Sequence, residues 1–513
     1  MGAVNSASVS NFQDAQWRKH NFGFYLQDTW KVTRKLTFDY GIRWDYQTAY
    51  QELYSRNSEF APLVPNPSAG GLLGATQYEG YGPGRCNCSF TRTYPYALGP
   101  RLGIAYQFAP KTVLRAGWGL VYGTTAAVNY QLGGALGTGF NTLSFTNPAY
   151  GEQALALQNG LHYSTADLYA ATLDPGNRPT AGQINSPGAY EDPSGGRPGR
   201  INQWNISLQR AISQDLLVEA AYVGNRAVWL QADGLVDFNV LSQQRLASFG
   251  LDINNAANRA LLILPVSSPQ VIAAGFKAPY AGFPTSSTLA QALRPYPQFA
   301  GLGGRWVARG NSWYDSLQSK VTKRYGHGLT ASLSFTWQKE LNLGAGGLGA
   351  NIVTTPVNDI LNRNQNKYIG ADSQPFQFIF AFSYRMPVLT SNRWVRAVQR
   401  DWTLGGVFRY VSGLPIQAPL AQNNLASLLF RGTFANRVPG QPLFLKDLNC
   451  HCIDPNKDFV LNPAAWSDPA AGQFGTSAAY YNDYRQERRP TETMSCSSDT
   501  GGACVTGKEP RGP

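Results

Sequence analysis

The sequence is poor in charged residues and contains no long hydrophobic run. Charged residues make up 14% of the 513 residues, whereas about 25% is usual in soluble domains. No stretch approaches the roughly 20 consecutive apolar residues that a membrane-spanning helix needs. Residues 1–21 also lack the apolar segment of a signal peptide. These deficits exclude a helical membrane protein and argue against a fully solvated surface.

Histidine and catalytic motifs are also scarce. The four histidines lie far apart, and none belongs to an HExxH motif or a nucleophile elbow. The segment from Gly344 to Gly349 formally matches GxGxxG, but no helix of useful length follows it, so it does not predict a dinucleotide site. We therefore expect no enzymatic activity and no cofactor.

The net charge of +12 does not indicate nucleic-acid binding. That function requires basic residues to gather on one surface. Here they are scattered singly or placed at chain reversals such as Arg34-Lys35 and Lys323-Arg324. We expect no nucleic-acid partner.

Aromatic residues, by contrast, reach 12% of the chain and follow a strict alternation. Between residues 21 and 46 the apolar side chains occupy even positions on both sides of a short Thr-Arg-Lys break, while most charged residues occupy odd positions. A period of two predicts strands with one apolar face. The pattern recurs and predicts five strand pairs, at residues 21–46, 101–122, 204–222, 313–337 and 376–410.

The connections between these pairs are long. They cover about residues 48–97, 124–200, 226–312 and 339–373. Compact soluble domains rarely contain loops longer than about 15 residues. Transmembrane β-barrels join strands of about 10 residues by short periplasmic turns and long external loops. The sequence therefore predicts an all-β fold, an antiparallel transmembrane β-barrel with long extracellular loops.

The alternation assigns each strand residue to the lumen or to the lipid. A cation at mid-bilayer costs about 2 to 4 kcal/mol on the lipid side, so charges should face the lumen. The candidates for the lumen are Asp39, Arg43, Asp45, Arg101, Arg115 and Glu219. The candidates for a lipid-facing aromatic belt are Phe22, Phe24, Trp30, Trp44, Tyr46, Trp118, Trp204, Phe378 and Trp402. Asp28 shares the apolar phase, and we expect it near the membrane interface.

A soluble all-β protein is the alternative that period alone leaves open, since the strands of a large sandwich or propeller also alternate. The low charge, the strand length and the unequal loops favour the barrel. The repeats of fixed period that a propeller would show are absent.

The cysteines suggest disulfides in the loops. Cys86 and Cys88 lie in one long connection, and Cys450 and Cys452 lie in a late one. Six cysteines allow 15 pairings, and the sequence does not choose among them. A metal site that combines these four thiols with His451 is an alternative, although the spacing matches no known zinc pattern.

Several segments resemble the C-terminal part of TonB-dependent outer-membrane receptors, and the Oar-like group fits best. They are FYLQDTWKVTRKLTFDYGIRWDY, PYALGPRLGIAYQFAPKTVLRAGWGLVYG, INQWNISLQRAISQDLLVEAAYVGNRAVWL, FVLNPAAWSDP and FGTSAAYYNDYRQERRP. The resemblance implies a 22-stranded barrel in the outer membrane of a Gram-negative bacterium. A plug domain would close that barrel, and TonB would supply the energy for import.

The sequence departs from this pattern at both ends. It begins inside the barrel, without plug or TonB box, and a polar, glycine-rich segment follows Met494. We interpret the chain as a fragment with about half or more of the barrel. Residues 1–412 would form hairpins, residues 413–490 a late extracellular loop, and residues 491–513 a disordered tail.

The function implied by the resemblance is import of a large or scarce substrate, of the siderophore, oligosaccharide or peptide class, without chemistry. The expected partners are outer-membrane lipid, an unknown extracellular ligand and TonB, which would act through the plug. An outer-membrane protein for adhesion or export is the alternative, because barrels with very long loops also serve those functions.

Overall fold

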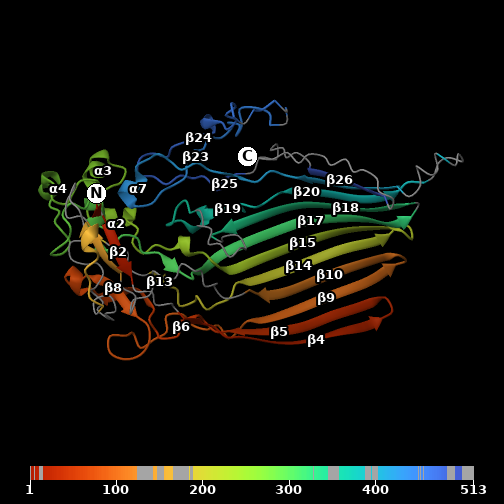
Figure 1. The fold of residues 1–513 in the computed structure, drawn as a ribbon, viewed down its shortest axis with the longest axis horizontal. Coiled ribbons are helices and arrows are strands. Elements are labelled where there is room, and N and C mark those ends of the chain that lie inside the picture. Colours follow the sequence, from red (N-terminus) through yellow and green to blue (C-terminus); the bar gives the residue numbers. More distant parts are fainter. Residues whose placement is uncertain are drawn as a thin grey trace.

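A computed structural model describes most of the chain. The described residues are 2–4, 6–10, 16–123, 142–146, 155–165, 184, 189–326, 328–344, 357–387, 394, 402–448, 450, 452–454, 456–481 and 491–498. Figure 1 shows a long antiparallel sheet with a cluster of short helices and irregular segments at one end.

The described residues contain one main sheet of twelve strands, eleven of them along a single path. In chain order these eleven are β4 (Asn21–Thr33), β5 (Leu36–Gln47), β9 (Leu98–Ala109), β10 (Thr112–Tyr122), β14 (Arg200–Ala211), β15 (Leu216–Gln231), β17 (Ala308–Gly326), β18 (Leu329–Leu343), β20 (Phe376–Arg385), β21 (Trp402–Val411) and β26 (Thr491–Ser498). Each pairs with its predecessor in this series, and β19 (Lys367–Ile369) pairs with β18. The five predicted strand pairs are confirmed.

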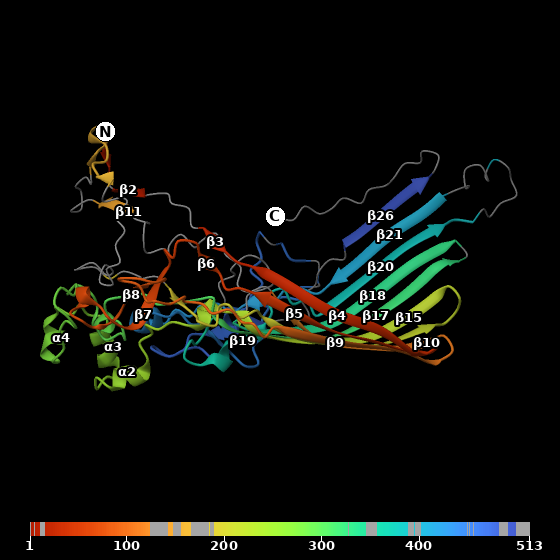
Figure 2. The ribbon, with the colours of Figure 1, turned by 90° about the horizontal axis from the view of Figure 1, so that it is seen from below.

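The sheet curves, but its edges do not meet. Figure 2 shows the curvature, with β26 and β21 rising out of the plane of the other strands. Strands β4 and β26 are the two edges, and no ladder joins them in the described part of the chain.

The prediction of a disordered tail is wrong for its first eight residues. Thr491–Ser498 form strand β26, which pairs antiparallel with β21, so that Arg409 lies opposite Thr491. Residues 499–513 lie outside the described residues. The backbone of β21 supplies the hydrogen-bonding edge that this polar sequence extends, which is a tertiary effect that local composition does not reveal.

The large apolar side chains of the sheet are exposed rather than packed. Phe24 is 63% exposed, Leu102 57% and Trp337 53%. Among the described residues no second layer covers these side chains. A sandwich would bury them between two sheets, so the soluble alternative is wrong. No described helix has the length and hydrophobicity required to cross a membrane.

The long connections fold together into a unit that we call the cap, made of residues 48–97, 189–199, 232–307, 357–375, 412–448, 450, 452–454 and 456–481. Its helices are α2 (Gln243–Ala247), α3 (Ala256–Leu262), α4 (Pro269–Ala273), α5 (Leu289–Ala292) and α7 (Leu425–Leu429), with 3-10 turns at Pro67–Ala69, Asp233–Leu235, Arg363–Asn366 and Pro463–Ala465. Its strand pairs are β7 (Ser58–Pro65) with β8 (Leu73–Tyr78), β13 (Tyr190–Glu191) with β16 (Gly304–Arg305), β22 (Ile416–Gln417) with β25 (Tyr480–Tyr481), and β23 (Asn436–Arg437) with β24 (Trp466–Ser467).

The remaining short strands precede the sheet or lie in its first and second connections. They are β1 (Ala3–Val4) with β12 (Leu155–Ala156), β2 (Ser6–Ser10) with β11 (Thr142–Thr146), and β3 (Trp17–Arg18) with β6 (Gln51–Glu52). A further 3-10 turn covers Leu157–Asn159.

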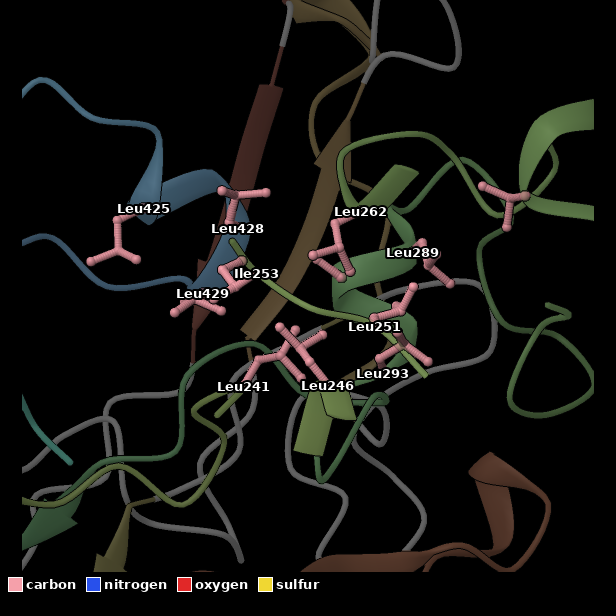
Figure 3. Packing of buried hydrophobic residues seen from close by; sticks show 12 residues of the cluster. Leu241, Leu246, Leu251, Ile253, Leu262, Leu289, Leu293, Leu425, Leu428 and Leu429 are labelled. Carbon is pink, nitrogen blue, oxygen red and sulfur yellow. The ribbon is translucent and has the colours of Figure 1, made fainter. Parts of the chain in front are cut away.

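The hydrophobic core of the protein lies in the cap and not under the sheet. Figure 3 shows leucines from two connections meeting there. The fully buried members include Leu241, Leu246 and Leu262 from one connection and Leu425 and Leu428 from another. Burial of a leucine side chain contributes about 1.5 to 3 kcal/mol, so this contact stabilises the two connections against each other.

A matched pair of arginine substitutions on β18 tests the assignment of the two sheet faces. Phe335 shares the face of Trp337, and Thr336 points to the opposite face. In lipid vesicles we expect Phe335→Arg to lower the free energy of unfolding by about 2 to 4 kcal/mol, because the charge enters hydrocarbon. Thr336→Arg should change it far less. Equal losses for the two variants would contradict the assignment.

Candidate functional site

The register places all six predicted lumen residues on one face of the sheet, which we call the polar face. Asp39, Arg43 and Asp45 lie on β5, and Arg101 lies opposite Gly41 of the same strand. Arg115 lies opposite Ala105, which in turn lies opposite Thr37. Glu219 shares its face with Ala221, the partner of Ser207, and Ser207 is the partner of Arg115.

The nine predicted belt residues lie on the other face, which we call the aromatic face. Trp118 lies opposite Trp204, and the ring centroids of Phe24 and Trp44 are 5.9 Å apart. The registers assign the remaining members to the same face: Phe22, Trp30, Tyr46, Phe378 and Trp402.

Asp28 is the predicted exception, and it lies on the aromatic face. The Tyr40 hydroxyl donates a hydrogen bond of 2.8 Å to its Oδ2, and the Thr29 amide donates one of 2.8 Å to its Oδ1. Both carboxylate oxygens are thus satisfied within the sheet, which reduces the cost of placing the charge on this face.

A groove runs along the polar face beside β5, β9, β10 and β14. Its polar lining consists of Arg43, Asp45, Gln47, Arg101, Gln203 and Asn205. Arg43 donates from Nε to both carboxylate oxygens of Asp45, at 2.8 and 2.9 Å. Gly117 keeps the groove open, since a Cβ there would lie 2.8 Å from the Asn205 side chain. The groove therefore offers guanidinium, carboxylate and amide groups to a polar ligand.

Buried carboxylates join three connections in the cap. Arg305 Nη1 donates to Glu191 Oε1 at 2.7 Å, and Asn57 Nδ2 donates to the same oxygen at 2.6 Å. Glu59 accepts the Glu191 amide at 3.1 Å. These contacts link residues that are more than 100 positions apart in the sequence. The sequence did not predict this cluster, because residues so far apart in the chain share no local motif.

Burial raises the pKa of Glu59 to about 8. The hydrogen bond from the Glu191 amide lowers this pKa, but by less than burial raises it. Burial likewise raises the pKa of Glu79, against hydrogen bonds from Ser89 and the Phe90 amide. In both carboxyl groups burial shifts the equilibrium toward the protonated form relative to an exposed glutamate.

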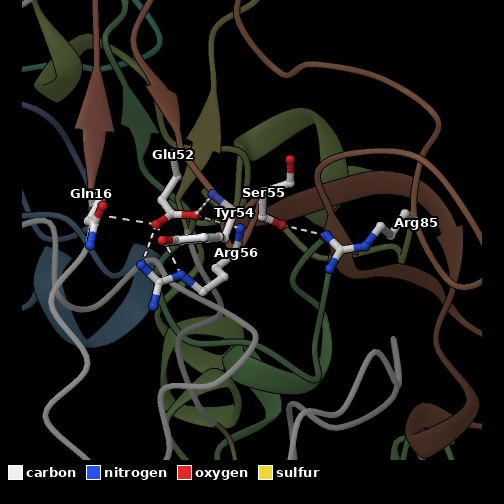
Figure 4. A network of polar contacts seen from close by, with 6 residues as sticks. All are labelled: Gln16, Glu52, Tyr54, Ser55, Arg56 and Arg85. Carbon is white, nitrogen blue, oxygen red and sulfur yellow. Dashed lines mark hydrogen bonds and ion pairs between the residues drawn. The ribbon is translucent and has the colours of Figure 1, made fainter.

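A second network fixes the start of the first connection, and Figure 4 shows it around Glu52. Burial alone would raise the pKa of Glu52, but hydrogen bonds from Arg56, from the Tyr54 amide at 2.9 Å and from the Gln16 amide at 3.3 Å lower it. Arg85 donates to the Ser55 carbonyl beside it. The charged Glu52 thus holds the segment before β4 against the cap.

The structure pairs the loop cysteines as close neighbours. Cys86 bonds to Cys88 and Cys450 bonds to Cys452, each with Cα atoms 5.1 Å apart. Each bridge spans a single intervening residue and does not join distant loops. His451 lies outside the described residues, and within those described no cluster of three or more His, Cys, Asp or Glu is arranged to hold a metal.

The comparison with protein families identifies the family of this chain. A family model described as an outer membrane beta barrel domain matches residues 1–495. The chain belongs to this family. It is an outer-membrane β-barrel protein of a Gram-negative bacterium.

The solved structures to which this chain is similar include two named as transporters and one named as an outer-membrane receptor. The copper transporter OprC is 10% identical with a TM-score of 0.33, and the match covers 77% of this chain and 36% of that one. The alcaligin receptor FauA from Bordetella pertussis is 12% identical, with a TM-score of 0.29 and coverages of 77% and 38%. The FrpB iron transporter from Neisseria meningitidis is 11% identical, with a TM-score of 0.31 and coverages of 77% and 33%.

The chain spans roughly a third of the length of these structures. The comparison with curated proteins gives no match.

Loss of the buried guanidinium of Arg305 is expected to destabilise the cap. Arg305→Ala leaves Glu191 buried without its cation, which typically costs about 3 to 5 kcal/mol. Arg309→Ala is the matched control, because Arg309 is largely exposed and lies 4.0 Å from Asp192, a geometry that contributes about 0 to 1 kcal/mol. Amide hydrogen exchange of β13 and β16 measures the difference, and similar protection in both variants would contradict the structure.

The cap is also expected to lose stability as the pH rises. The pKa of Glu59 is raised from 4.5 to about 8 in the folded cap. Its protonation therefore stabilises the fold fully below pH 4.5, and this contribution is lost as the pH rises through about 8. The thermal midpoint of the cap, followed by tryptophan fluorescence, should fall over this range, and Glu59→Gln should reduce the fall. An undiminished pH dependence in that variant would rule out Glu59 as its source.

Proposed function

We propose that this chain forms part of the barrel wall and the extracellular cap of a TonB-dependent receptor of the Oar-like group. The observation that carries the proposal is the separation of the two faces: aromatic side chains stay exposed along one face, while six charged residues share the other. Hydrocarbon outside and water inside a barrel require this separation.

The orientation follows from the connections. The turns at Arg34-Lys35 and Pro110-Lys111 are short, and the cap is built from the long connections at the opposite strand ends. Outer-membrane barrels place short turns in the periplasm and long loops outside. The cap therefore faces the medium, and the polar face lines the lumen below it.

The groove suggests the class of ligand. Arg43 and Arg101 supply cationic donors, while Gln47, Gln203 and Asn205 supply amides that donate and accept. Such a lining suits a large polar ligand with oxygen acceptors, and we propose a siderophore, an oligosaccharide or a peptide. The ligand would bind in the cap and pass along the polar face without chemical change.

Movement of a bound ligand through a plugged barrel requires energy. In TonB-dependent receptors the plug receives it from TonB, and we propose that the complete protein contains such a plug inside the wall described here.

Adhesion or export is a second candidate, and the folded cap favours it. A cap with its own leucine core and buried ion pair presents a rigid surface. A rigid surface can bind another cell or a secreted partner without any passage through the lumen.

Uptake measurements in paired host strains distinguish the two candidates. We expect cells that carry the full-length protein to accumulate at least one labelled ligand from a panel of ferric siderophores, oligosaccharides and peptides. Accumulation should stop in a strain without TonB, while surface binding persists. Arg43→Ala with Arg101→Ala should weaken uptake. Binding to cells without TonB-dependent accumulation of any panel member would favour the adhesin.

A further inference from the structure

A cluster of charged residues lies on the aromatic face, on the opposite side of the sheet from the proposed import path. We call Arg226, Asp315, Lys339 and Lys367 the outer cluster. Arg226 lies opposite Trp313, Asp315 opposite Lys339, and Lys367 opposite Leu343. The four residues belong to the neighbouring strands β15, β17, β18 and β19.

Aromatic side chains surround the outer cluster. Lys367 Nζ lies 4.2 Å from the ring centroid of Trp313, and the Arg226 guanidinium lies 5.4 Å from that of Trp204. The Tyr222 hydroxyl donates to Asp315 Oδ1 at 2.6 Å. Aromatic rings mixed with cations are typical of the interface between hydrocarbon and headgroups.

The distance of the outer cluster from the periplasmic strand ends matches the expected position of that interface. Arg226 lies ten residues after Leu216, where β15 begins, and Asp315 lies eleven residues before Gly326, where β17 ends. At about 3.3 Å per residue and a tilt of about 40°, both lie about 25 to 28 Å above the periplasmic ends of their strands. The apolar band of an outer-membrane barrel is about 25 Å tall, so Arg226 and Asp315 lie at its outer edge. Lys367 lies higher, opposite Leu343 at the end of β18.

The aromatic face below the outer cluster is free of charge down to the periplasmic end. On β17 the residues in this phase are Leu317, Ser319 and Val321, followed by Lys323, which pairs with Asp215 at the turn. Charges therefore mark both edges of the apolar band. On β15 and β17 the periplasmic edge carries this neutral pair, whereas the outer edge of strands β15 to β19 carries the three cations and one anion of the outer cluster.

The excess positive charge of the outer cluster has no anionic partner within the described residues. Arg226 Nη2 lies 2.8 Å from Asp315 Oδ2, which neutralises one cation. No carboxylate of the described chain lies within ion-pair distance of Lys339 or Lys367, and both lysines are exposed. Two exposed cations at the headgroup level are complementary to anionic groups of the membrane.

We propose that the outer cluster binds the phosphate groups of a phosphorylated lipid of the outer leaflet. Lys339 and Lys367 contact the phosphates, Arg226 and Asp315 hold the site in shape, and Trp204 and Trp313 pack on the sugar or acyl end. The inference rests on the proposed membrane orientation. It depends on charge complementarity at the headgroup level and not on any transport step.

The test uses the full-length protein purified from outer membranes and placed in phosphatidylcholine nanodiscs. The probes are lipid A with its phosphates and lipid A from which the phosphates have been removed, and native mass spectrometry measures the retained lipid. We expect the phosphorylated form to be retained preferentially, and high salt to release it. Equal retention of the two forms would overturn the proposal. It would also be overturned if free inorganic phosphate, at the same concentration as lipid A, displaced the bound lipid.

Paired variants locate the site. Each basic residue near an anionic headgroup contributes about fivefold to affinity, so Lys339→Gln with Lys367→Gln should weaken retention about 25-fold. The control is Arg115→Gln with Lys320→Gln, which removes two cations from the polar face and should leave retention unchanged. Equal weakening in both pairs would contradict the site.

A heat-dependent gel shift confirms that each variant still forms a barrel. A protein that shows no shift refutes the barrel orientation, whereas a shifted protein without phosphate preference refutes only the lipid site.

Discussion

The structure depends on one sheet that separates two solvents. Strands pair through their backbones, so every interior strand satisfies its hydrogen bonds within the sheet and can enter hydrocarbon. The aromatic face then gains free energy of about 25 cal/mol for each Å² removed from water. Within the part of the chain that the structure describes, no second layer covers Phe24, Leu102 or Trp337. We propose that the membrane takes the place that a second layer would have in a soluble protein.

The cap follows the opposite principle, because it faces water and must bury its own apolar residues. Its leucine core joins two connections, and the buried pair of Glu191 and Arg305 joins two more segments. Strands β15 and β17 are long enough, at 16 and 19 residues, to rise from the apolar band into this cap. The outer cluster lies where the two environments meet, which explains why charge and aromatic residues occur together there.

The sheet could be predicted from the sequence because each strand lies between two different environments. Trp30, Phe38 and Ile104 share a face and a register, and their period of two is visible without the fold. The cap could not be predicted, since its helices have only four to seven residues and its apolar residues follow no period. The N-caps Ser242, Asn255 and Thr288 were the available local signal. Glu191 and Arg305 are 114 positions apart, and only the folded chain brings them together.

The most direct test of the account measures what surrounds each residue of β18 in a bilayer. Spin labels placed one at a time from Leu329 to Trp337 report contact with oxygen, which concentrates in lipid, and with a water-soluble nickel complex. The account predicts alternation, with oxygen favoured at Leu329, Ala331, Leu333, Phe335 and Trp337 and nickel favoured at Thr330, Ser332, Ser334 and Thr336. Uniform access to nickel, or protection of both sets from both reagents, would contradict it.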